Sequence, residues 1–305
     1  MSVEAKAGWG LLGLILFLCL TGLHAQQSTP RCANCAEWNL PQEPFRVYGN
    51  TYFVGTHGLS SILITSPSGH VLIDGALAES VPQIAAHIRQ LGFRVEDVKF
   101  ILNSHVHFDH AGGIPELQRL SGARVFASDW SAAVMSGPGL AKDDPQYGSI
   151  PPIAPVARVE TVHDGQELTV GELRLTAHLT PGHTPGGTSW TWQSCEGGKC
   201  LNFVYADSLS PASADGFKFS SPEHEQLMQG FQRSYAFLRS TPCDILLTPH
   251  PDASPLWSQL KAARLQNMPL PAADHTACHD LADGFSQQLR ERIAAEKQEN
   301  AQTPR

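Results

Sequence analysis

Four side chains of metal-ligand type lie within six positions of the segment Asn103-Ser-His-Val-His-Phe-Asp-His110. His105 and His107 are two residues apart, so in extended backbone their side chains point to the same side and can bind one metal ion. Asp109 and His110 come after the chain turns and can reach a second ion nearby. Neutral imidazoles suit Zn²⁺, and a carboxylate compensates the charge of a dication. The motif therefore predicts a zinc centre.

Two further histidines stand directly after strand-like segments. His183 lies in Leu179-Thr-Pro-Gly-His-Thr-Pro-Gly-Gly187, and His250 lies in Leu246-Leu-Thr-Pro-His-Pro251. Either histidine alone is more typical of a polar loop, but together they supply the ligands that the first motif lacks for two sites. Three protein ligands leave open positions on a zinc ion, which is typical of a catalytic rather than a structural site.

Alternating strands and helices must position these motifs. The pattern predicts strands at Phe45–Tyr48, Thr51–Gly55, Ser61–Ser66, His70–Asp74, Lys99–Asn103, Arg124–Ala127, Arg158–Val162, Glu167–Val170, Leu173–Leu179, Thr188–Trp192, Leu201–Ala206 and Asp244–Thr248. Helical periods cover Val81–Leu91, Gly113–Leu120, Asp129–Ser136, Glu223–Arg239, Pro255–Gln266 and Ala273–Glu299. Strands followed by helices, twice over, predict two β-sheets packed face to face with helices outside. A Gly- and Pro-rich loop, Gly137–Pro155, separates the halves; its part Gly148–Pro155 either walls the site or is a plain connector.

Composition excludes several classes of protein. The chain has 305 residues, of which 42% are apolar and 16% charged, so it is too apolar to be disordered. Its length fits one large domain or two fused halves. The net charge of -8 and the isoelectric point near 5.9 disfavour binding to the phosphates of nucleic acid.

Residues 1–25 have the order of a secretory signal peptide: Lys6, an apolar run from Leu11 to Leu20, and the small residue Ala25 as the cleavage position. The run is too short to cross a bilayer about 30 Å thick. Cys19 follows a large Leu, which disfavours a lipoprotein anchor. We therefore expect an exported, periplasmic protein that is free of the membrane after cleavage.

Cysteine usage agrees with export. Without Cys19, six of the seven cysteines remain, and an even number in an oxidising compartment predicts disulfides, with 15 possible pairings. Cys195 and Cys200 flank a Glu-Gly-Gly-Lys turn, so a bond across a hairpin is geometrically easy, and Cys243–Cys278 is then a natural second pair. Cys32 and Cys35 form a lone CxxC, for which we expect a structural disulfide, either between the two or as a local clip.

The motifs together resemble the metallo-β-lactamase superfamily. The HxHxDH segment, the PGHTPGG segment around His183, Tyr205-Ala-Asp-Ser-Leu-Ser210 and the TPHP segment around His250 are most similar to subclass B3 enzymes, over nearly the whole mature chain. The resemblance implies an αββα sandwich with mixed sheets and the active site between them. It implies one domain, residues 26–305, made of two pseudo-repeat halves, about 26–155 and 156–305.

The resemblance also implies the site. His105, His107 and His183 would hold a first zinc ion, and Asp109, His110 and His250 a second. A hydroxide on the metals would attack the lactam carbonyl without an acyl-enzyme, and Asp109 would orient it while the second zinc stabilises the leaving nitrogen. The hydroxyls of Ser208 and Ser210 would face the substrate carboxylate.

Two positions depart from relatives or differ between them. An aspartate in a motif similar to that of Asp207 bridges the two metals in glyoxalase-like members of the superfamily. In subclass B3 enzymes this aspartate is not a ligand, and we follow that interpretation. Some related enzymes have a cysteine at the position of His57, bonded to the cysteine that matches Cys32. Because this chain has His57, Cys32 needs another partner, and Cys35 is the obvious one.

The leading hypothesis is a monomeric dizinc enzyme that opens penicillins, cephalosporins and carbapenems and thereby confers antibiotic resistance. The first alternative is another dizinc hydrolase acting on lactones or thioesters, since the ligand set alone does not separate the two. A zinc-dependent binding protein without turnover is a third reading, against which the open metal positions argue. Nucleic-acid processing is disfavoured by the acidic charge and the export signal.

Overall fold

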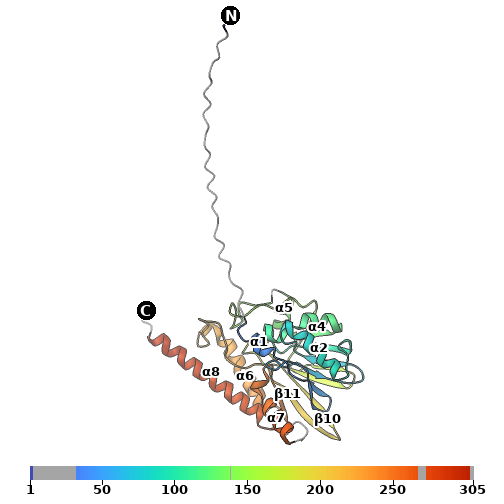
Figure 1. Cartoon of the computed structure of the whole chain (residues 1–305). Coiled ribbons are helices and arrows are strands. Elements are labelled where there is room, and N and C mark those ends of the chain that lie inside the picture. The colour runs from blue at the N-terminus through green and yellow to red at the C-terminus, as the bar shows by residue number, and fades with distance from the viewer. Residues whose placement is uncertain (3–31, 138, 267–272, 303–305) are drawn as a thin grey trace.

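The computed structural model describes residues 1–2, 32–137, 139–266 and 273–302 (Figure 1). Positions 3–25 of the expected signal peptide, with the cleavage position at Ala25, lie outside the described residues. Among the helices that are described, none combines the length and apolarity needed to cross a membrane.

Two mixed β-sheets form the centre of the molecule, as predicted. The first has seven strands in the order β1-β2-β3-β4-β5-β6-β7, antiparallel up to β4 and parallel from β4 to β7. Its strands are β1 (Phe45–Tyr48), β2 (Thr51–Phe53), β3 (Ile62–Ile64), β4 (His70–Ile73), β5 (Val98–Leu102), β6 (Arg124–Ser128) and β7 (Val159–Val162). The strand β7 follows the long loop, so the first sheet takes its last strand from the second half of the chain.

The second sheet has five strands in the order β12-β11-β10-β9-β8, with only the β11–β12 pair parallel. Its strands are β8 (Glu167–Val170), β9 (Leu173–Leu179), β10 (Thr188–Glu196), β11 (Lys199–Tyr205) and β12 (Ile245–Leu247). The hairpin between β10 and β11 turns at Gly197 and Gly198, both with positive φ (57° and 81°), a conformation that costs glycine little.

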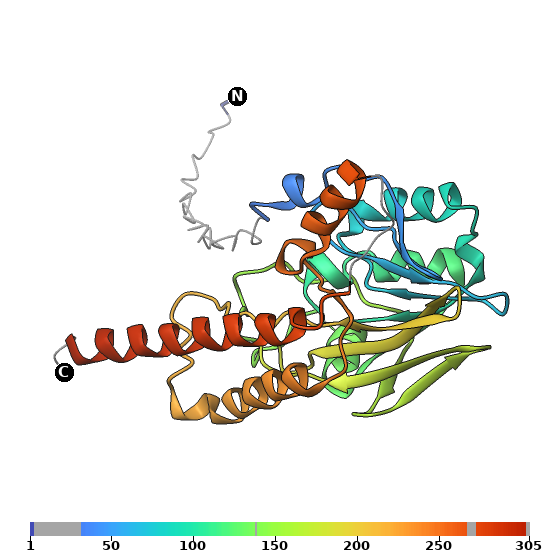
Figure 2. The same ribbon diagram turned by 90° about the horizontal axis from the view of Figure 1, so that it is seen from below.

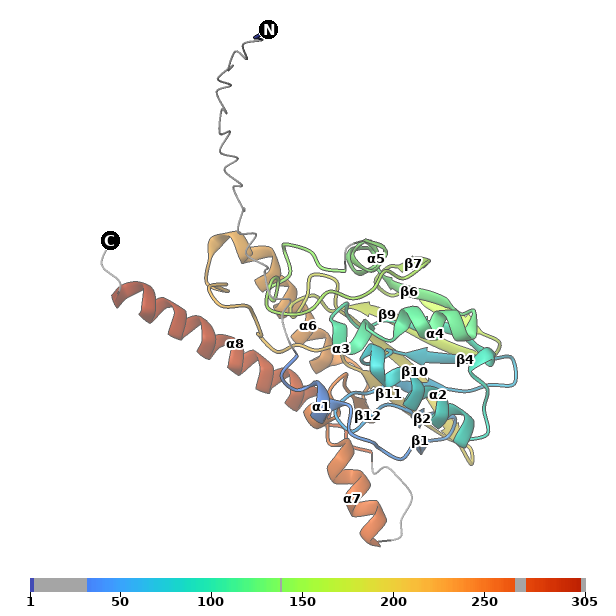
Figure 3. The same ribbon diagram turned by 45° about the horizontal axis from the view of Figure 1, so that its top comes forward.

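Helices cover the outer faces of both sheets (Figure 2). The α-helices are α1 (Cys35–Trp38), α2 (Val81–Gln90), α3 (Phe108–Ala111), α4 (Ile114–Ser121), α5 (Asp129–Ser136), α6 (Glu225–Ser240), α7 (Leu256–Gln266) and α8 (Ala277–Gln302). Short 3₁₀ turns lie at Ala78–Ser80, Val95–Asp97, Pro222–His224 and Pro251–Ala253. Helices α2, α4 and α5 lie over the first sheet, whereas α6 and α8 run side by side over the second (Figure 3).

Three apolar cores match the three interfaces between these four layers. Alternate strand residues point to opposite faces, so Leu72 packs under the helices while its neighbours Val71 and Ile73 face the second sheet. Trp190 is fully buried between the sheets. The prediction of a sandwich with helices outside is therefore confirmed, and it leaves the two open ends of the sandwich for loops.

Most predicted elements are present with bounds within a few residues, but two short helices were not predicted. Helix α5 begins where expected, because the Ser128 hydroxyl accepts a hydrogen bond from the Ser131 N–H as an N-cap. The unpredicted helices are α1 and α3, each four residues long. Such single turns bury too little apolar surface to leave a periodic pattern.

Among the described residues, three disulfides join Cys32 to Cys35, Cys195 to Cys200 and Cys243 to Cys278. Cys195 and Cys200 are directly opposite in the β10–β11 hairpin. Cys243 follows α6 and Cys278 lies in the first turn of α8, and both are buried in the core that these two helices share with the second sheet. Disulfides of this kind are typical of proteins from oxidising compartments.

Candidate metal centre

The ligand-type residues meet at one end of the sandwich. His105 and His107 follow β5, and Asp109 and His110 lie on the short helix α3 that comes next. His183 follows β9 and His250 follows β12, so both sheets contribute to the same place. Strand ends rather than loops alone hold these side chains, which gives them a fixed frame.

The first group consists of His105, His107 and His183, whose nitrogen atoms lie within 4.8 Å of one another. All three residues are buried. The ring centroids of His105 and His183, and those of His107 and His183, are 4.9 Å apart. The three imidazoles therefore converge on one point.

The second group consists of Asp109, His110 and His250, again within 4.8 Å. Oδ2 of Asp109 lies 3.3 Å from Nε2 of His110 and 3.2 Å from Nε2 of His250. The ring of His110 is 4.5 Å from that of His105, so the two groups adjoin. All six residues predicted as ligands are thus brought together, three to each group.

Protonation states favour cation binding. Burial, followed by the charges of neighbouring histidines, lowers the pKa of His105 well below its usual range, and burial with the charge of His107 lowers the pKa of His183 to about 3. Burial alone would raise the pKa of Asp109, but His110 and His250 hold it well below its usual range. Neutral imidazoles and an ionised carboxylate are the forms that bind a dication.

One orphaned atom shows that a metal ion fits. Nε2 of His105 is buried without a hydrogen-bond partner, and a buried polar atom without a partner is costly. Nδ1 of the same ring lies 2.7 Å from Oδ1 of Asp207, so that side of the ring is already used. An ion bound by the first group would give Nε2 its missing partner. Nitrogen and carboxylate donors in threes suit zinc.

Two buried acidic residues, Asp207 and Asp74, contact the segment that contains Ser104 and His105. Asp207 belongs to neither ligand group, and its Oδ1 contacts Nδ1 of His105. Asp74 accepts hydrogen bonds from the backbone N–H (2.8 Å) and hydroxyl (2.6 Å) of Ser104 and from the hydroxyl of Tyr205 (2.8 Å). It therefore holds the backbone that precedes His105 rather than a ligand ring itself.

Two residues near the site were missed by sequence reasoning. Oδ2 of Asp144 lies 3.0 Å from Nε2 of His107, and Nε2 of Gln146 lies 3.3 Å from Nε2 of His183. Both residues come from the loop between α5 and β7. The only signal for them was the length of that loop, which is typical of either a functional or a flexible segment and does not indicate which side chains lie near the site.

Trp38 is a third residue that sequence reasoning missed. Its ring centroid is 5.1 Å from that of His250. Its carbonyl oxygen accepts hydrogen bonds from the Gly58 N–H (3.0 Å) and the Thr56 hydroxyl (2.7 Å). The N-terminal helix α1 thus places an indole beside the second ligand group.

The two predicted substrate-binding serines lie on the loop after β11. Ser208 and Ser210 are both half-buried. The carbonyl oxygen of Ser210 is 2.9 Å from Nδ1 of His183, and its hydroxyl oxygen is 3.3 Å from the same atom. Ser210 therefore holds the ring of His183 through its backbone carbonyl oxygen.

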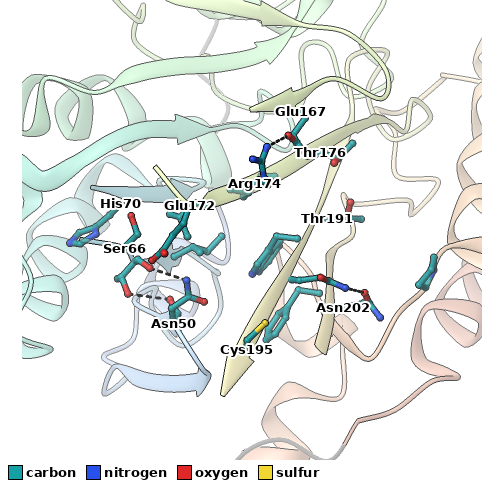
Figure 4. Close-up of a pocket in the computed structure, with 18 of the residues that line it drawn as sticks. Asn50, Ser66, His70, Glu167, Glu172, Arg174, Thr176, Thr191, Cys195 and Asn202 are labelled. Carbon is teal, nitrogen blue, oxygen red and sulfur yellow. Dashed lines mark hydrogen bonds and ion pairs between the residues drawn. The ribbon is translucent and has the colours of Figure 1, made fainter. Parts of the chain in front are cut away.

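A cavity of about 1050 Å³ lies at the other end of the sandwich (Figure 4). It is lined by the β3–β4 turn, by the start of β4 at His70 and by the β8–β9 hairpin. Its cation Arg174 is paired with Glu167 at 2.7 Å. Neither of the two ligand groups lines this cavity. The converging histidines, and not this cavity, are therefore the candidate site.

Comparison with known proteins shows which family the chain resembles. The family model described as the metallo-beta-lactamase superfamily matches residues 54–196. The chain is similar to the crystal structure of MEM-A1, a subclass B3 metallo-beta-lactamase isolated from a soil metagenome library, with 50% identity, a TM-score of 0.83, and coverage of 86% of this chain and 99% of that one. It is also similar to Rm3 metallo-beta-lactamase, with 50% identity, a TM-score of 0.85, and coverage of 88% of this chain and 100% of that one.

A more distant relative has a different activity in its name. The N-acyl homoserine lactonase AttM of Azorhizobium caulinodans is 26% identical over 234 residues, which are 66% of this chain and 84% of that protein.

Proposed function

The chain belongs to subclass B3 of the metallo-β-lactamase superfamily, and we propose that it hydrolyses the β-lactam amide bond of penicillins, cephalosporins and carbapenems and so confers antibiotic resistance. The observation that carries the proposal is the pair of adjoining ligand groups, three residues each, at the end of the sandwich. Their donor set, five imidazoles and one carboxylate, is suited to two Zn²⁺ ions.

We assign His105, His107 and His183 to a first zinc ion and Asp109, His110 and His250 to a second. When bound, the ions polarise the lactam carbonyl and lower the pKa of water, so that a nucleophile forms near neutral pH. No serine or cysteine of the chain is needed as a nucleophile, and we expect no acyl-enzyme.

Asp109 is the proposed catalytic residue. Its carboxylate is 8% exposed, and its Oδ2 lies close to both histidines of its own group. Its charge also acts on His105 and His183 of the first group. An ionised carboxylate in the second group, whose charge also reaches the first, can accept a hydrogen bond from the attacking water and fix its direction.

Ser208 and Ser210 are the proposed contacts of the substrate carboxylate. Both lie on the loop that also holds His183. A hydroxyl donates one hydrogen bond to a carboxylate, which orients the lactam without drawing charge away from the reacting carbonyl. This assignment places the substrate between the two sheets, over the ligand groups.

One observation favours a second candidate. The relative named as an N-acyl homoserine lactonase is similar over most of its length, and the same activated water attacks a lactone or a thioester. The 50% identity to two metallo-beta-lactamase structures favours the lactam.

The test is loss of the ultraviolet absorbance of a carbapenem with zinc-loaded protein, with and without a chelator. Parallel assays use an N-acyl homoserine lactone and a glutathione thioester. The proposal expects rapid lactam opening that the chelator abolishes while the circular dichroism spectrum keeps its folded shape. Turnover of only the lactone or the thioester by folded protein with two zinc ions would transfer the assignment to the second candidate.

The domain and the compartment complete the proposal. We treat residues 26–305 as one domain, because β7 from the second half completes the first sheet. The three disulfides support an exported protein, and we propose the periplasm, with cleavage near Ala25. Mass spectrometry of the mature N-terminus tests the cleavage position.

A further inference from the structure

Asp144 is a buried acidic residue on a loop. It lies between α5, which ends at Ser136, and β7, which begins at Val159. Only 2% of its surface is exposed. Acidic residues are almost never buried so deeply unless they are paired, so its partners should explain its position.

The two carboxylate oxygens of Asp144 have different partners. Oδ2 lies 3.0 Å from Nε2 of His107, and Oδ1 accepts a hydrogen bond of 2.8 Å from the backbone N–H of Gln146. One oxygen thus closes a turn of the loop while the other holds the imidazole. Because the carboxylate accepts, Nε2 of His107 carries the proton and Nδ1 keeps its lone pair.

His107 therefore presents the opposite nitrogen from the other two members of its group. Nδ1 of His105 is taken by Asp207, and Nδ1 of His183 by the carbonyl oxygen of Ser210, so these rings present Nε2. A wrong tautomer or a flipped ring at His107 would direct an N–H at the centre of the group. Hydrogen bonds from outside commonly settle this choice for ligand histidines.

We infer that Asp144 is a positioning residue, which fixes the tautomer and orientation of His107 and so couples metal binding at the first group to the conformation of the loop at residues 139–158. The inference rests on the proposed assignment of His107 as a metal ligand. It adds a residue that neither touches the metal nor lies on the sandwich framework.

Other contacts show that this loop is firmly joined to its surroundings. The carbonyl oxygen of Pro145 accepts a hydrogen bond of 2.8 Å from the N–H of Ala214. Ala214 belongs to the loop that also contains Ser210, the partner of His183. His107 and His183 are therefore each held by a loop, and the two loops are hydrogen-bonded to each other. Metal binding to the two rings should order both loops together.

The experiment compares wild type with Asp144→Asn, which keeps the shape of the side chain but removes its charge. The matched control is Asp143→Asn, because Asp143 is the adjacent acid, and its one hydrogen bond among the described residues is the 2.9 Å bond that it accepts from the indole of the half-buried Trp130. Zinc affinity is measured by competition with a chromophoric chelator. We expect Asp144→Asn to weaken the first site about 10- to 100-fold and Asp143→Asn to leave it unchanged.

Two further measurements distinguish positioning from general destabilisation. Nitrogen-15 spectra of the zinc-free protein should show His107 protonated at Nε2 in wild type and a mixture of tautomers in Asp144→Asn. Hydrogen exchange of peptides spanning residues 142–150 should slow on zinc addition in wild type and much less in the variant. An Asp144→Asn protein with wild-type zinc affinity, tautomer and exchange would overturn the inference. If wild type itself binds no zinc, the proposed function fails, while the tautomer still tests the role of Asp144.

Discussion

Oδ1 of Asp207 lies 2.7 Å from Nδ1 of His105, and both side chains are completely buried. The contact joins residues 102 positions apart and spans the two sheets, since Asp207 follows β11 and His105 follows β5. Burial, followed by the charge of Asp74, raises the pKa of Asp207 well above its usual range. A cation on the far nitrogen of His105 favours the ionised form of such a carboxylate. A metal ion bound at Nε2 of His105 would therefore stabilise the ionised carboxylate of Asp207 in this pair.

Asp207→Asn is expected to lower zinc affinity about 10- to 100-fold without unfolding the protein. An amide cannot supply the negative charge that strengthens the basicity of His105, although it can keep the hydrogen bond. Chelator competition measures the affinity, and thermal unfolding of the zinc-free protein is the control. Unchanged affinity in a folded variant would show that His105 does not need this carboxylate.

Gly187→Ala tests how tightly Asp207 is held. A Cβ at Gly187 would overlap Oδ2 of Asp207 and come within 2.5 Å of the Thr180 carbonyl oxygen. We expect a loss of about 1–3 kcal/mol in the free energy of unfolding, as in other overpacked cores, together with weaker zinc binding. Urea denaturation of the zinc-free protein measures the first effect.

The control for this substitution is Gly284→Ala, in helix α8. A Cβ there meets nothing within 4 Å, and alanine favours a helix interior over glycine by about 0.5–1 kcal/mol. This variant should be slightly more stable than wild type and bind zinc normally. A Gly187→Ala protein as stable as wild type would mean that the packing around Asp207 is looser than the structure shows.

More of the fold could be predicted from the sequence than of the contacts that surround the candidate site. Strands such as Glu167–Val170 and helix α5 were predicted with their observed bounds, because alternation and an N-cap are local signals. The six proposed ligands were predicted as well, since they stand in short motifs at strand ends.

What the sequence did not predict depends on distant contacts. Helix α1 is one turn closed by the Cys32–Cys35 disulfide and pressed against Gly58, where a Cβ would come within 2.6 Å of Cα of Trp38. Asp144 reaches His107 across 37 positions of the chain. No periodicity links residues so far apart. The sequence of a polar loop also does not show whether an acidic residue in it is exposed or buried.

The Cys243–Cys278 bond should contribute more stability than the Cys195–Cys200 bond. The first closes a loop with a sequence separation of 35, the second one with a separation of 5. In the chain-entropy model, the Cys243–Cys278 bond adds about 4 kcal/mol to the free energy of unfolding and the Cys195–Cys200 bond about 2 kcal/mol. Paired Cys→Ser variants compared by urea denaturation under oxidising conditions measure both. An equal loss for the two pairs would mean that buried packing or strain, rather than loop closure, sets the contribution.

Glu296 on helix α8 should make stability depend on pH far from the metal centre. The residue is 1% exposed and accepts hydrogen bonds from the N–H groups of Phe219 (3.1 Å) and Ser220 (2.8 Å) and from Nε of Arg292 (2.7 Å). Burial alone would raise its pKa, but these donors hold the pKa of Glu296 below its usual range. A lowered folded pKa means that the stabilisation is complete above the unfolded pKa of about 4.3 and is lost as pH falls through the folded value.

Glu296→Gln should therefore cost about 2 kcal/mol in the free energy of unfolding at pH 7, the typical worth of hydrogen bonds to a charged group, and progressively less below about pH 4.3. Glu291→Gln on the same helix is the control, because Glu291 is exposed and, within the part of the chain that the structure describes, accepts a single hydrogen bond, from Gln287 at 2.8 Å. It should change stability by less than about 0.5 kcal/mol at either pH. Urea denaturation of zinc-free protein at pH 7 and pH 4 measures both variants. A difference between wild type and Glu296→Gln that stays constant between the two pH values would show that the carboxylate of Glu296 is not stabilised as an anion in the folded protein.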